Sequence, residues 1–244
     1  MNTLFKFFLL SIHFVLGQNK VNVYEDFEKY PVYNSKIKEE KCCEHSIKQV
    51  ITTNKALQFT LKSSDSLVSA GMRSEIAFFT EPTPWICRDY TFKIILPRTY
   101  LKDSEPEIYA QWHEVPDFKY GETWRNPPIS LQIINGYWYL NIKWSKSQIN
   151  TNSNIDGNKL FKLAKVRSGK IYNFKFSIKY SINNDGFVRC SINNVTRLNY
   201  NGPNYYNDLH GPFFKIGIYK ATWKNNKFSK PKILSVIFDD ISIK

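Results

Sequence analysis

Residues 172–180 read Tyr-Asn-Phe-Lys-Phe-Ser-Ile-Lys-Tyr, so that large apolar side chains alternate with polar ones. A period of two predicts a β-strand with one buried and one open face. The Asn-Asn-Asp-Gly of residues 183–186 follows and is typical of a hairpin turn. Residues 187–193 are then expected to return as the partner strand, so this stretch predicts an antiparallel sheet with one face covered.

The rest of the chain repeats this pattern in short segments. Asn135-Gly136 interrupts the apolar run of residues 133–138 as a second hairpin signal, and residues 233–243 read as a closing strand. Residues 117–128 and 145–158 read as irregular or loop segments, and no internal repeat or second domain boundary is evident. Few long helical patterns occur, which predicts an all-β sandwich or barrel.

Composition limits the class of protein and of partner. The 244 residues are 42% hydrophobic and 16% aromatic, which fits one large, folded all-β domain. A formal net charge of +13 predicts a polyanionic partner: nucleic acid, an anionic membrane surface or an acidic polysaccharide. A generally basic surface that aids solubility is the alternative, and composition alone does not choose among these.

The first seventeen residues resemble a secretory signal peptide. Lys6 precedes a short apolar run over residues 7–16, and Gly17 suits a cut before Gln18. We therefore expect a signal peptide over 1–17, a single domain over 18–244, and secretion to the extracellular space or periplasm. The alternative is an N-terminal membrane anchor, which the short apolar run disfavours.

Four cysteines remain after that cut: Cys42, Cys43, Cys87 and Cys190. Secretion permits disulfides. Adjacent cysteines rarely bond each other, so Cys42 or Cys43 could pair with Cys87 or Cys190, or the thiols stay free and buried; the sequence does not fix the connectivity. The spacing does not match a zinc site.

Three strand-like segments carry polar side chains on one face only. They are residues 72–76, 109–113 and 211–220, and alternation groups Arg73 with Glu75, Gln111 with His113, and Lys215 with Gly217 and Tyr219. The opposite faces are apolar and suit a core. If the strands are neighbours in a concave sheet, the polar groups line one groove, and Gly217 leaves room there for a ligand.

These residue types suit β-elimination from a uronate. The reaction removes the proton beside the carboxylate and expels the sugar oxygen across the ring. Arginine and glutamine can neutralise the carboxylate and stabilise the enolate-like charge. A neutral histidine is a competent base near neutral pH, and a phenol beside Lys or Arg ionises more readily.

The motifs together resemble a known group. Arg-Ser-Glu-Ile (73–76), Gln-Trp-His (111–113), Pro-Pro-Ile-Ser-Leu (127–131) and Gly-Pro-Phe-Phe-Lys-Ile-Gly-Ile-Tyr-Lys (211–220) occur in the order found in heparin lyase I-like polysaccharide lyases, which include glucuronan lyases. Jelly-roll alginate lyases are more distantly similar. The resemblance runs from about Tyr24 to the C-terminus, and it implies a concanavalin-like β-jelly-roll sandwich of two antiparallel sheets with a concave substrate groove.

The resemblance also implies roles for individual residues. His113 would be a catalytic base and Tyr219 the acid, or acid and base together. Gln111 and Arg73 would bind the uronate carboxylate, and Lys215 would support Tyr219 and the substrate. Glu75 either contacts substrate or orients Arg73. Relatives often carry Tyr where this chain has Phe213, which leaves the catalytic set untouched.

Further candidates lie outside these motifs. Tyr139, Asn141 and Lys143 share a strand face and either add subsites or face solvent. Trp124 and Arg125 could clamp a sugar from their loop. Asp26 and Asp240, with their acidic neighbours, could hold a structural calcium ion if the termini meet, or they could be ordinary surface carboxylates.

The prediction is thus a secreted polysaccharide lyase acting on a uronate polymer, expected to be a monomer that needs no cofactor for its chemistry and has no stable membrane insertion. A non-catalytic carbohydrate-binding jelly roll is the first alternative. A glycoside hydrolase would need paired carboxylates, for which no convincing strand exists. A nucleic-acid binder is suggested by charge alone. Glucuronan, heparin or heparan sulfate, and alginate all remain open as substrates.

Overall fold

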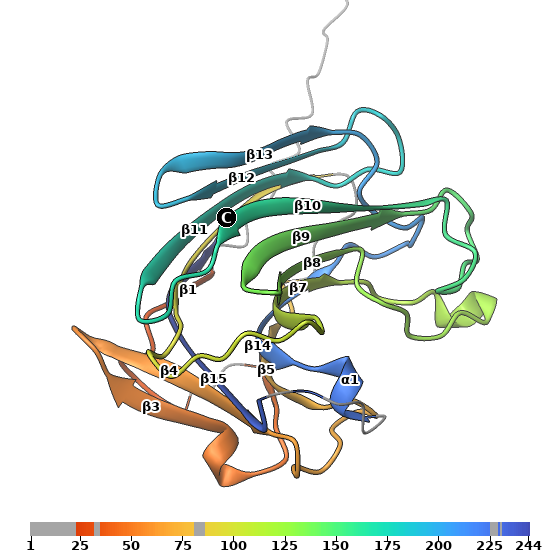
Figure 1. Ribbon diagram of the computed structural model, residues 1–244. Coiled ribbons are helices and arrows are strands. Elements are labelled where there is room, and N and C mark those ends of the chain that lie inside the picture. The colour runs from red at the N-terminus through yellow and green to blue at the C-terminus, as the bar shows by residue number, and fades with distance from the viewer. Residues whose placement is uncertain (1–22, 32–34, 81–85, 225–228, 230) are drawn as a thin grey trace, which may run out of the picture.

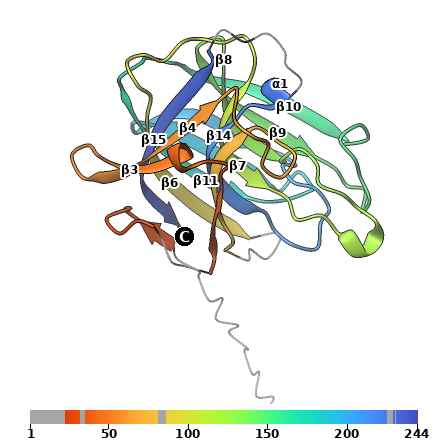
Figure 2. The same ribbon diagram turned by 90° about the horizontal axis from the view of Figure 1, so that it is seen from below.

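The computed structural model describes residues 23–31, 35–80, 86–224, 229 and 231–244. Two antiparallel sheets lie face to face (Figures 1 and 2). The first has the order β13 (Val195–Asn201), β12 (Phe187–Ile192), β11 (Ile171–Lys179), β6 (Cys87–Ile95), β15 (Ile233–Ile243), β4 (Lys55–Lys62) and β3 (Ile47–Ile51), with β1 (Val23–Glu25) pairing β15. The second has the order β10 (Gly157–Lys165), β9 (Tyr137–Trp144), β8 (Ile129–Ile134), β7 (Glu107–His113), β14 (Phe213–Tyr219), β5 (Arg73–Phe78) and β2 (Ile37–Glu40).

Helical structure is limited to three short pieces among the described residues: η1 (Glu44–Ser46), η2 (Phe118–Tyr120) and α1 (Ala221–Lys224). No helix in this part of the chain has the length and apolarity needed to cross a bilayer. The predicted all-β sandwich is therefore confirmed. The proposed signal peptide, residues 1–17, falls outside the described residues.

The hairpins form where the sequence predicts them. In β11 the apolar residues from Tyr172 onward are buried and the polar ones lie at the surface, and the strand pairs with β12 from Phe174↔Ile192 to Lys179↔Phe187. Asn135 and Gly136 join β8 to β9 with φ values of +51° and +73°. Both central residues of a type I′ turn need positive φ, which is why Asn-Gly suits this position.

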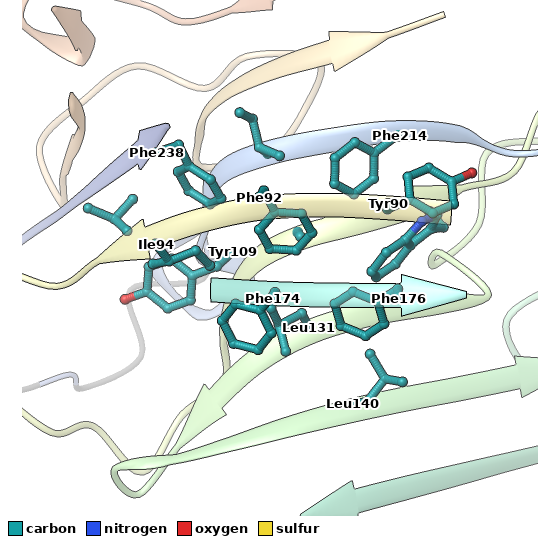
Figure 3. Packing of buried hydrophobic residues seen from close by; sticks show 14 of the residues in the cluster. Tyr90, Phe92, Ile94, Tyr109, Leu131, Leu140, Phe174, Phe176, Phe214 and Phe238 are labelled. Carbon is teal, nitrogen blue, oxygen red and sulfur yellow. The ribbon is translucent and has the colours of Figure 1, made fainter. Parts of the chain in front are cut away.

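The inner faces of the two sheets form one aromatic core (Figure 3). The Phe92 ring, from the first sheet, lies 5.6 Å from the Phe214 ring of the second, and Trp112 lies 4.8 Å from Phe176 across the same gap. Each buried ring stabilises the fold by roughly 2–3 kcal/mol. Because the apolar residues of the motif strands point into this core, their polar neighbours are forced onto the opposite face.

The expectation that Cys42 and Cys43 would not bond each other was wrong. Cys42 and Cys43 are bonded to each other, and Cys87 and Cys190 are free. Cys87 begins β6 at the surface, whereas Cys190 is buried on β12, so neither thiol is brought to the adjacent pair. Sheet pairing, which sequence spacing does not reveal, decides which cysteines can meet.

Candidate active site

The three motif strands are direct neighbours in the order β7–β14–β5, as the sequence analysis expected. In the register Lys215 pairs with Gln111 on β7, and Gly217 pairs with Glu75 on β5. The outward face of this part of the seven-stranded sheet carries Arg73, Gln111, His113, Lys215 and Tyr219, and we call it the site face. Ala110, Trp112, Phe214, Ile216 and Ile218 point into the core instead.

A buried cluster of charges lies at the centre of the site face. Lys215 Nζ is 2.9 Å from Glu75 Oε2 and 2.7 Å from Glu40 Oε2. Arg73 Nη1 contacts the same two oxygens at 3.3 and 3.1 Å. The Gln111 amide donates a short hydrogen bond to the other oxygen of Glu75. Two cations and two carboxylates therefore hold one another in fixed positions. Glu75 contacts Arg73, Gln111 and Lys215 and so orients all three.

Glu40 is a member of this cluster that the sequence analysis missed. It ends the edge strand β2, and β2 pairs with β5 so that Glu40 lies opposite Glu75. Burial alone would raise the pKa of Glu40, but the Lys215 and Arg73 charges outweigh it and bring that pKa below its usual value. Glu40 carries no motif of its own, and only the pairing of β2 with β5 identifies it.

Tyr219 lies at one end of the cluster, beside Arg73. The Arg73 guanidinium carbon is 4.9 Å from the centre of the Tyr219 ring, in a cation–π arrangement. Lys215 was expected to support Tyr219, but its ammonium is engaged by Glu40 and Glu75, so the cation beside the phenol is Arg73. No hydrogen bond to the Tyr219 hydroxyl occurs among the described residues, which leaves it available to a substrate.

Two glycines shape this end of the site in different ways. A Cβ on Gly217 would lie 2.2 Å from the Ser74 carbonyl oxygen, and its φ is +133°, so the predicted role of leaving room for a ligand was wrong. Gly217 is needed because the β5 backbone approaches it closely, at a point where the pairing of β14 with β7 on its other side is irregular. Gly71, in contrast, leaves room for side chains: a Cβ would lie 2.6 Å from Arg73 Nη2 and 2.7 Å from Tyr219 Cε2.

Substitution Gly71→Ala tests this packing. The added methyl group displaces the Arg73–Tyr219 pair, while flexible side chains limit the loss of stability to about 1 kcal/mol. We expect turnover to fall at least tenfold because the phenol and guanidinium lose their alignment. Initial rates and thermal unfolding measured side by side check this. Unchanged turnover in a folded variant would show that the pair needs no such space.

His113 lies at the other end of the site face, in an aromatic and acidic setting. Its ring stacks on Phe213 at 5.3 Å and meets Trp124 edge-on at 5.6 Å. The fully buried Glu114 places Oε2 2.8 Å from His113 Nδ1, and the Arg125 backbone N–H holds Glu114 Oε1 at 2.8 Å. Glu114 therefore faces His113 Nδ1 both with its carboxylate and with its backbone oxygen, which lies 3.3 Å from that nitrogen, so that Nε2 is directed away from Glu114. Glu114 is the second residue of the site that the sequence analysis missed.

Glu114→Gln should lower kcat by about tenfold or more with little change in KM, because an amide can fix the wrong tautomer of His113. The conservative Glu114→Asp variant should recover part of the loss if a carboxylate is what matters. Steady-state kinetics of the two variants separate the loss of the carboxylate from a packing defect, because a packing defect would lower kcat equally in Glu114→Gln and Glu114→Asp. Equal kcat in wild type and Glu114→Gln would remove Glu114 from the site.

The register shows how the two predicted proton-transfer residues are spaced. His113 pairs with Phe213, whereas Tyr219 pairs with Arg73 and Ile108. Six residues of extended strand span at most about 20 Å, and the bulge near Gly217 shortens this. His113 and Tyr219 therefore share one face but stand at its two ends. Lys215 and Gln111 lie between them.

The remaining substrate-binding candidates divide into two groups. Trp124 is 55% exposed beside His113, and Tyr139, Asn141 and Lys143 lie on β9 opposite its core-facing residues, so all four can face a ligand. Burial lowers the pKa of Lys143, and the nearby Glu114 opposes that shift.

Arg125 does not reach the site face. Its guanidinium is buried and bonds Glu122 at 2.7 Å, Asn150 at 2.7 Å and Asp208 at 2.9 Å. The expected sugar clamp is therefore a loop anchor, because two carboxylates compensate its charge inside the protein. Burial raises the pKa of Asp208 to about 7 despite the opposing charge of Arg125.

The predicted calcium segments do come together, since Glu25 pairs with Ile241 where β1 meets β15. Asp240, however, is ion-paired with Lys93, and Asp26 accepts a hydrogen bond from the Glu28 backbone. In the described part of the chain, three acidic, cysteine or histidine ligand atoms cluster within 4.8 Å only at Cys42–Cys43–Asp65 and at Asp117–Glu122–Asp208. Asp26 and Asp240 thus do not form a ready-made ion site, and calcium stays a prediction.

Comparison with known proteins identifies the family to which the chain belongs. A family model for polysaccharide lyase matches residues 26–242. The chain belongs to this polysaccharide lyase family. The match includes every residue of the site face, so the lyase has its charged cluster, His113 and Tyr219 within the family's own domain. None of the curated proteins matches the sequence.

Several solved structures have a fold similar to that of this lyase. An endo-β-1,4-glucuronan lyase from the fungus Trichoderma reesei is similar with a TM-score of 0.74 and 16% identity, over 91% of this chain and 94% of that one. The family 7 alginate lyase A1-II′ gives 0.56 and 16%, over 83% and 84%. A botulinum neurotoxin binding domain gives 0.53 and 10%, over 86% and 43%. At these identities the likeness shows the jelly-roll fold alone.

Proposed function

We propose that this lyase is secreted and cleaves a uronate-containing polysaccharide by β-elimination, leaving an unsaturated uronate at the new end. The observation that carries the proposal is the site face itself, where Arg73, Gln111 and Lys215 stand between an imidazole and a phenol. The similar structures include a glucuronan lyase and an alginate lyase, which supports a polyuronate as the substrate class.

The scissile linkage would lie beside Tyr219 and Arg73, within reach of Gln111. The uronate carboxylate is then nearest to Arg73 and Gln111, whose donors stabilise the negative charge that develops when the adjacent carbon loses its proton. Glu40 and Glu75 hold these donors in place before substrate arrives. Such preorganised charge needs little rearrangement during the reaction.

Two groups on this face can move the proton. In polyglucuronate the proton beside the carboxylate and the departing oxygen lie on the same side of the ring, so Tyr219, beside Arg73, takes that proton and returns a proton to the departing sugar oxygen. The carbon–oxygen bond breaks, a carbon–carbon double bond forms in the sugar ring, and no water is consumed. Where the proton and the departing oxygen lie on opposite sides of the ring, a second group would have to take the proton, and His113, held by Glu114, is the candidate.

The direct test is a screen of purified polyglucuronate, alginate and heparin, followed by the ultraviolet absorbance of the new double bond. The proposed function predicts rising absorbance with at least one polymer, and polyglucuronate is the first choice. Saturated reducing ends without absorbance would favour a hydrolase. Binding without any cleavage would favour the non-catalytic carbohydrate-binding alternative.

A further inference from the structure

A basic pocket lies at the edge of the sandwich, outside the site face. It forms between the end of β10 in one sheet and β11 and the β12–β13 hairpin in the other, and has a volume of about 410 Å³. Lys165, Arg167, Lys170 and Arg197 line it, together with the Asn193 amide. A smaller cavity of about 250 Å³ adjoins it, shares Arg167 and adds Lys102. We call the larger cavity the edge pocket.

The charges of the edge pocket are uncompensated. No aspartate or glutamate lines it, and none of its four cations forms an ion pair among the described residues. At the site face, by contrast, Lys215 and Arg73 are matched by Glu40 and Glu75. A cluster of four like charges around a cavity creates a positive potential that attracts anions. Part of the chain's net charge of +13 is thus concentrated where no carboxylate of residues 23–31, 35–80, 86–224, 229 or 231–244 is ion-paired with it.

The strand register leads from Tyr219 toward this pocket. Tyr219 pairs with Ile108 on β7, Ile108 with Gln132 on β8, Gln132 with Tyr139 on β9, and Tyr139 with Lys162 on β10. Four steps between strands cover about 19 Å. Lys165 follows Lys162 on the same edge strand. β10 contacts β13 of the other sheet, where the Phe161 ring packs on Tyr200, and Figure 1 shows β10, β12 and β13 at the same end of the sandwich.

Polar and cationic side chains mark this path. Tyr139 lies at the surface of β9, and Lys162 Nζ stands 3.5 Å from the centre of the Tyr137 ring. A polymer crossing the sheet from the Tyr219 end therefore meets further ligands for its hydroxyl and carboxylate groups before it reaches Lys165.

We propose that the edge pocket is a second binding site for the acidic polysaccharide, which holds carboxylates of the same chain several sugars away from the cleaved bond. This inference rests on the proposed function for the identity of its ligand. The pocket's role is to retain a long polymer between cleavage events. A short oligomer, which fills only the site face, does not use it.

The Asn194-Val195-Thr196 sequence is a glycosylation acceptor in the β12–β13 turn, between two residues that line the edge pocket. A glycan there would cover the pocket mouth. The test therefore uses protein made in a bacterial host, where this modification does not occur.

The test variant changes Lys165, Arg167, Lys170 and Arg197 to Gln. Its matched control changes Lys29, Lys48, Lys232 and Lys244 to Gln, four exposed lysines outside the edge pocket, so that both variants lose four charges. For each protein we would measure KM and kcat on long polyglucuronate and on a glucuronate tetrasaccharide. Affinity electrophoresis in gels containing polyglucuronate measures binding independently of cleavage.

We expect the pocket variant to raise KM for long polyglucuronate by roughly fivefold to tenfold, and to leave the tetrasaccharide constants within about twofold. Its retardation in the polymer gel should fall well below that of the control variant. Three results would each overturn the inference: an equal loss of gel retardation in the pocket and control variants, an equal change of KM on the polymer and the tetrasaccharide, or a wild type that the polymer gel does not retard. If the wild type is retarded but forms no unsaturated product, the proposed function fails while the edge pocket is still tested by the gel.

Discussion

Tyr219→Phe should lower the rate of unsaturated-product formation by a factor of 10² to 10⁴, the usual contribution of a positioned acid or base. The loss follows from chemistry rather than folding, because the Tyr219 ring keeps its place over Arg73 and the removed hydroxyl has no hydrogen-bond partner among the described residues. Initial rates on the cleaved polymer, followed by ultraviolet absorbance, measure the effect.

The matched control is Tyr120→Phe, an exposed tyrosine of η2 that loses the same atom away from the motif strands. Its rate should equal that of the wild type, and thermal unfolding of both variants should be unchanged within about 0.5 kcal/mol. A Tyr219→Phe enzyme that retains most of its turnover would assign the proton transfers to His113 or to another group.

Lys215→Met should destabilise the protein by about 3 kcal/mol, at the low end of the cost of breaking a buried ion pair. The substitution keeps an apolar chain of similar length but leaves Glu40 and Glu75 with only Arg73 to compensate them. Urea unfolding at neutral pH measures the loss. Lys38→Met, which removes an exposed lysine from the adjacent edge strand, should change stability by less than about 0.5 kcal/mol.

The pH dependence of this difference gives a second check. The folded protein holds the pKa of Glu40 below its usual value, so Glu40 contributes stability above that usual value and loses it as the pH falls through the folded pKa. The gap between wild type and Lys215→Met should therefore narrow in acid, as protonation removes the uncompensated charge. A gap that stays constant from neutral to acidic pH would mean that lost packing, not charge, causes the destabilisation.

Alternation along single strands predicted much of the architecture. The stretch of residues 172–180 became β11, Asn135-Gly136 became a two-residue turn, and residues 233–243 became β15 with the predicted bounds. These features depend on contacts close in sequence or on one strand's two faces. Arg73, Gln111, His113, Lys215 and Tyr219 were grouped on one face for the same reason.

Errors arose where distant segments meet. The vicinal disulfide, the burial of Arg125 among acids and the tight approach of β5 to Gly217 all depend on which segments pair in the folded chain. Glu40 was missed because it acts through Lys215, which lies on another strand. Glu114 was missed because it acts through His113, and the buried loop that carries Arg125 holds its carboxylate there.

The order of apolar and polar residues along the chain by itself determined the antiparallel sandwich and the faces of its motif strands, since a side chain's face depends only on its parity within a strand. The tertiary structure alone decided which carboxylates meet Lys215 and Arg73, and that four cations with no ion pair in the described part of the chain surround a cavity at the sandwich edge. Coulomb energy depends on distance in space, and strands far apart in sequence become neighbours only when the sheets close over their shared core.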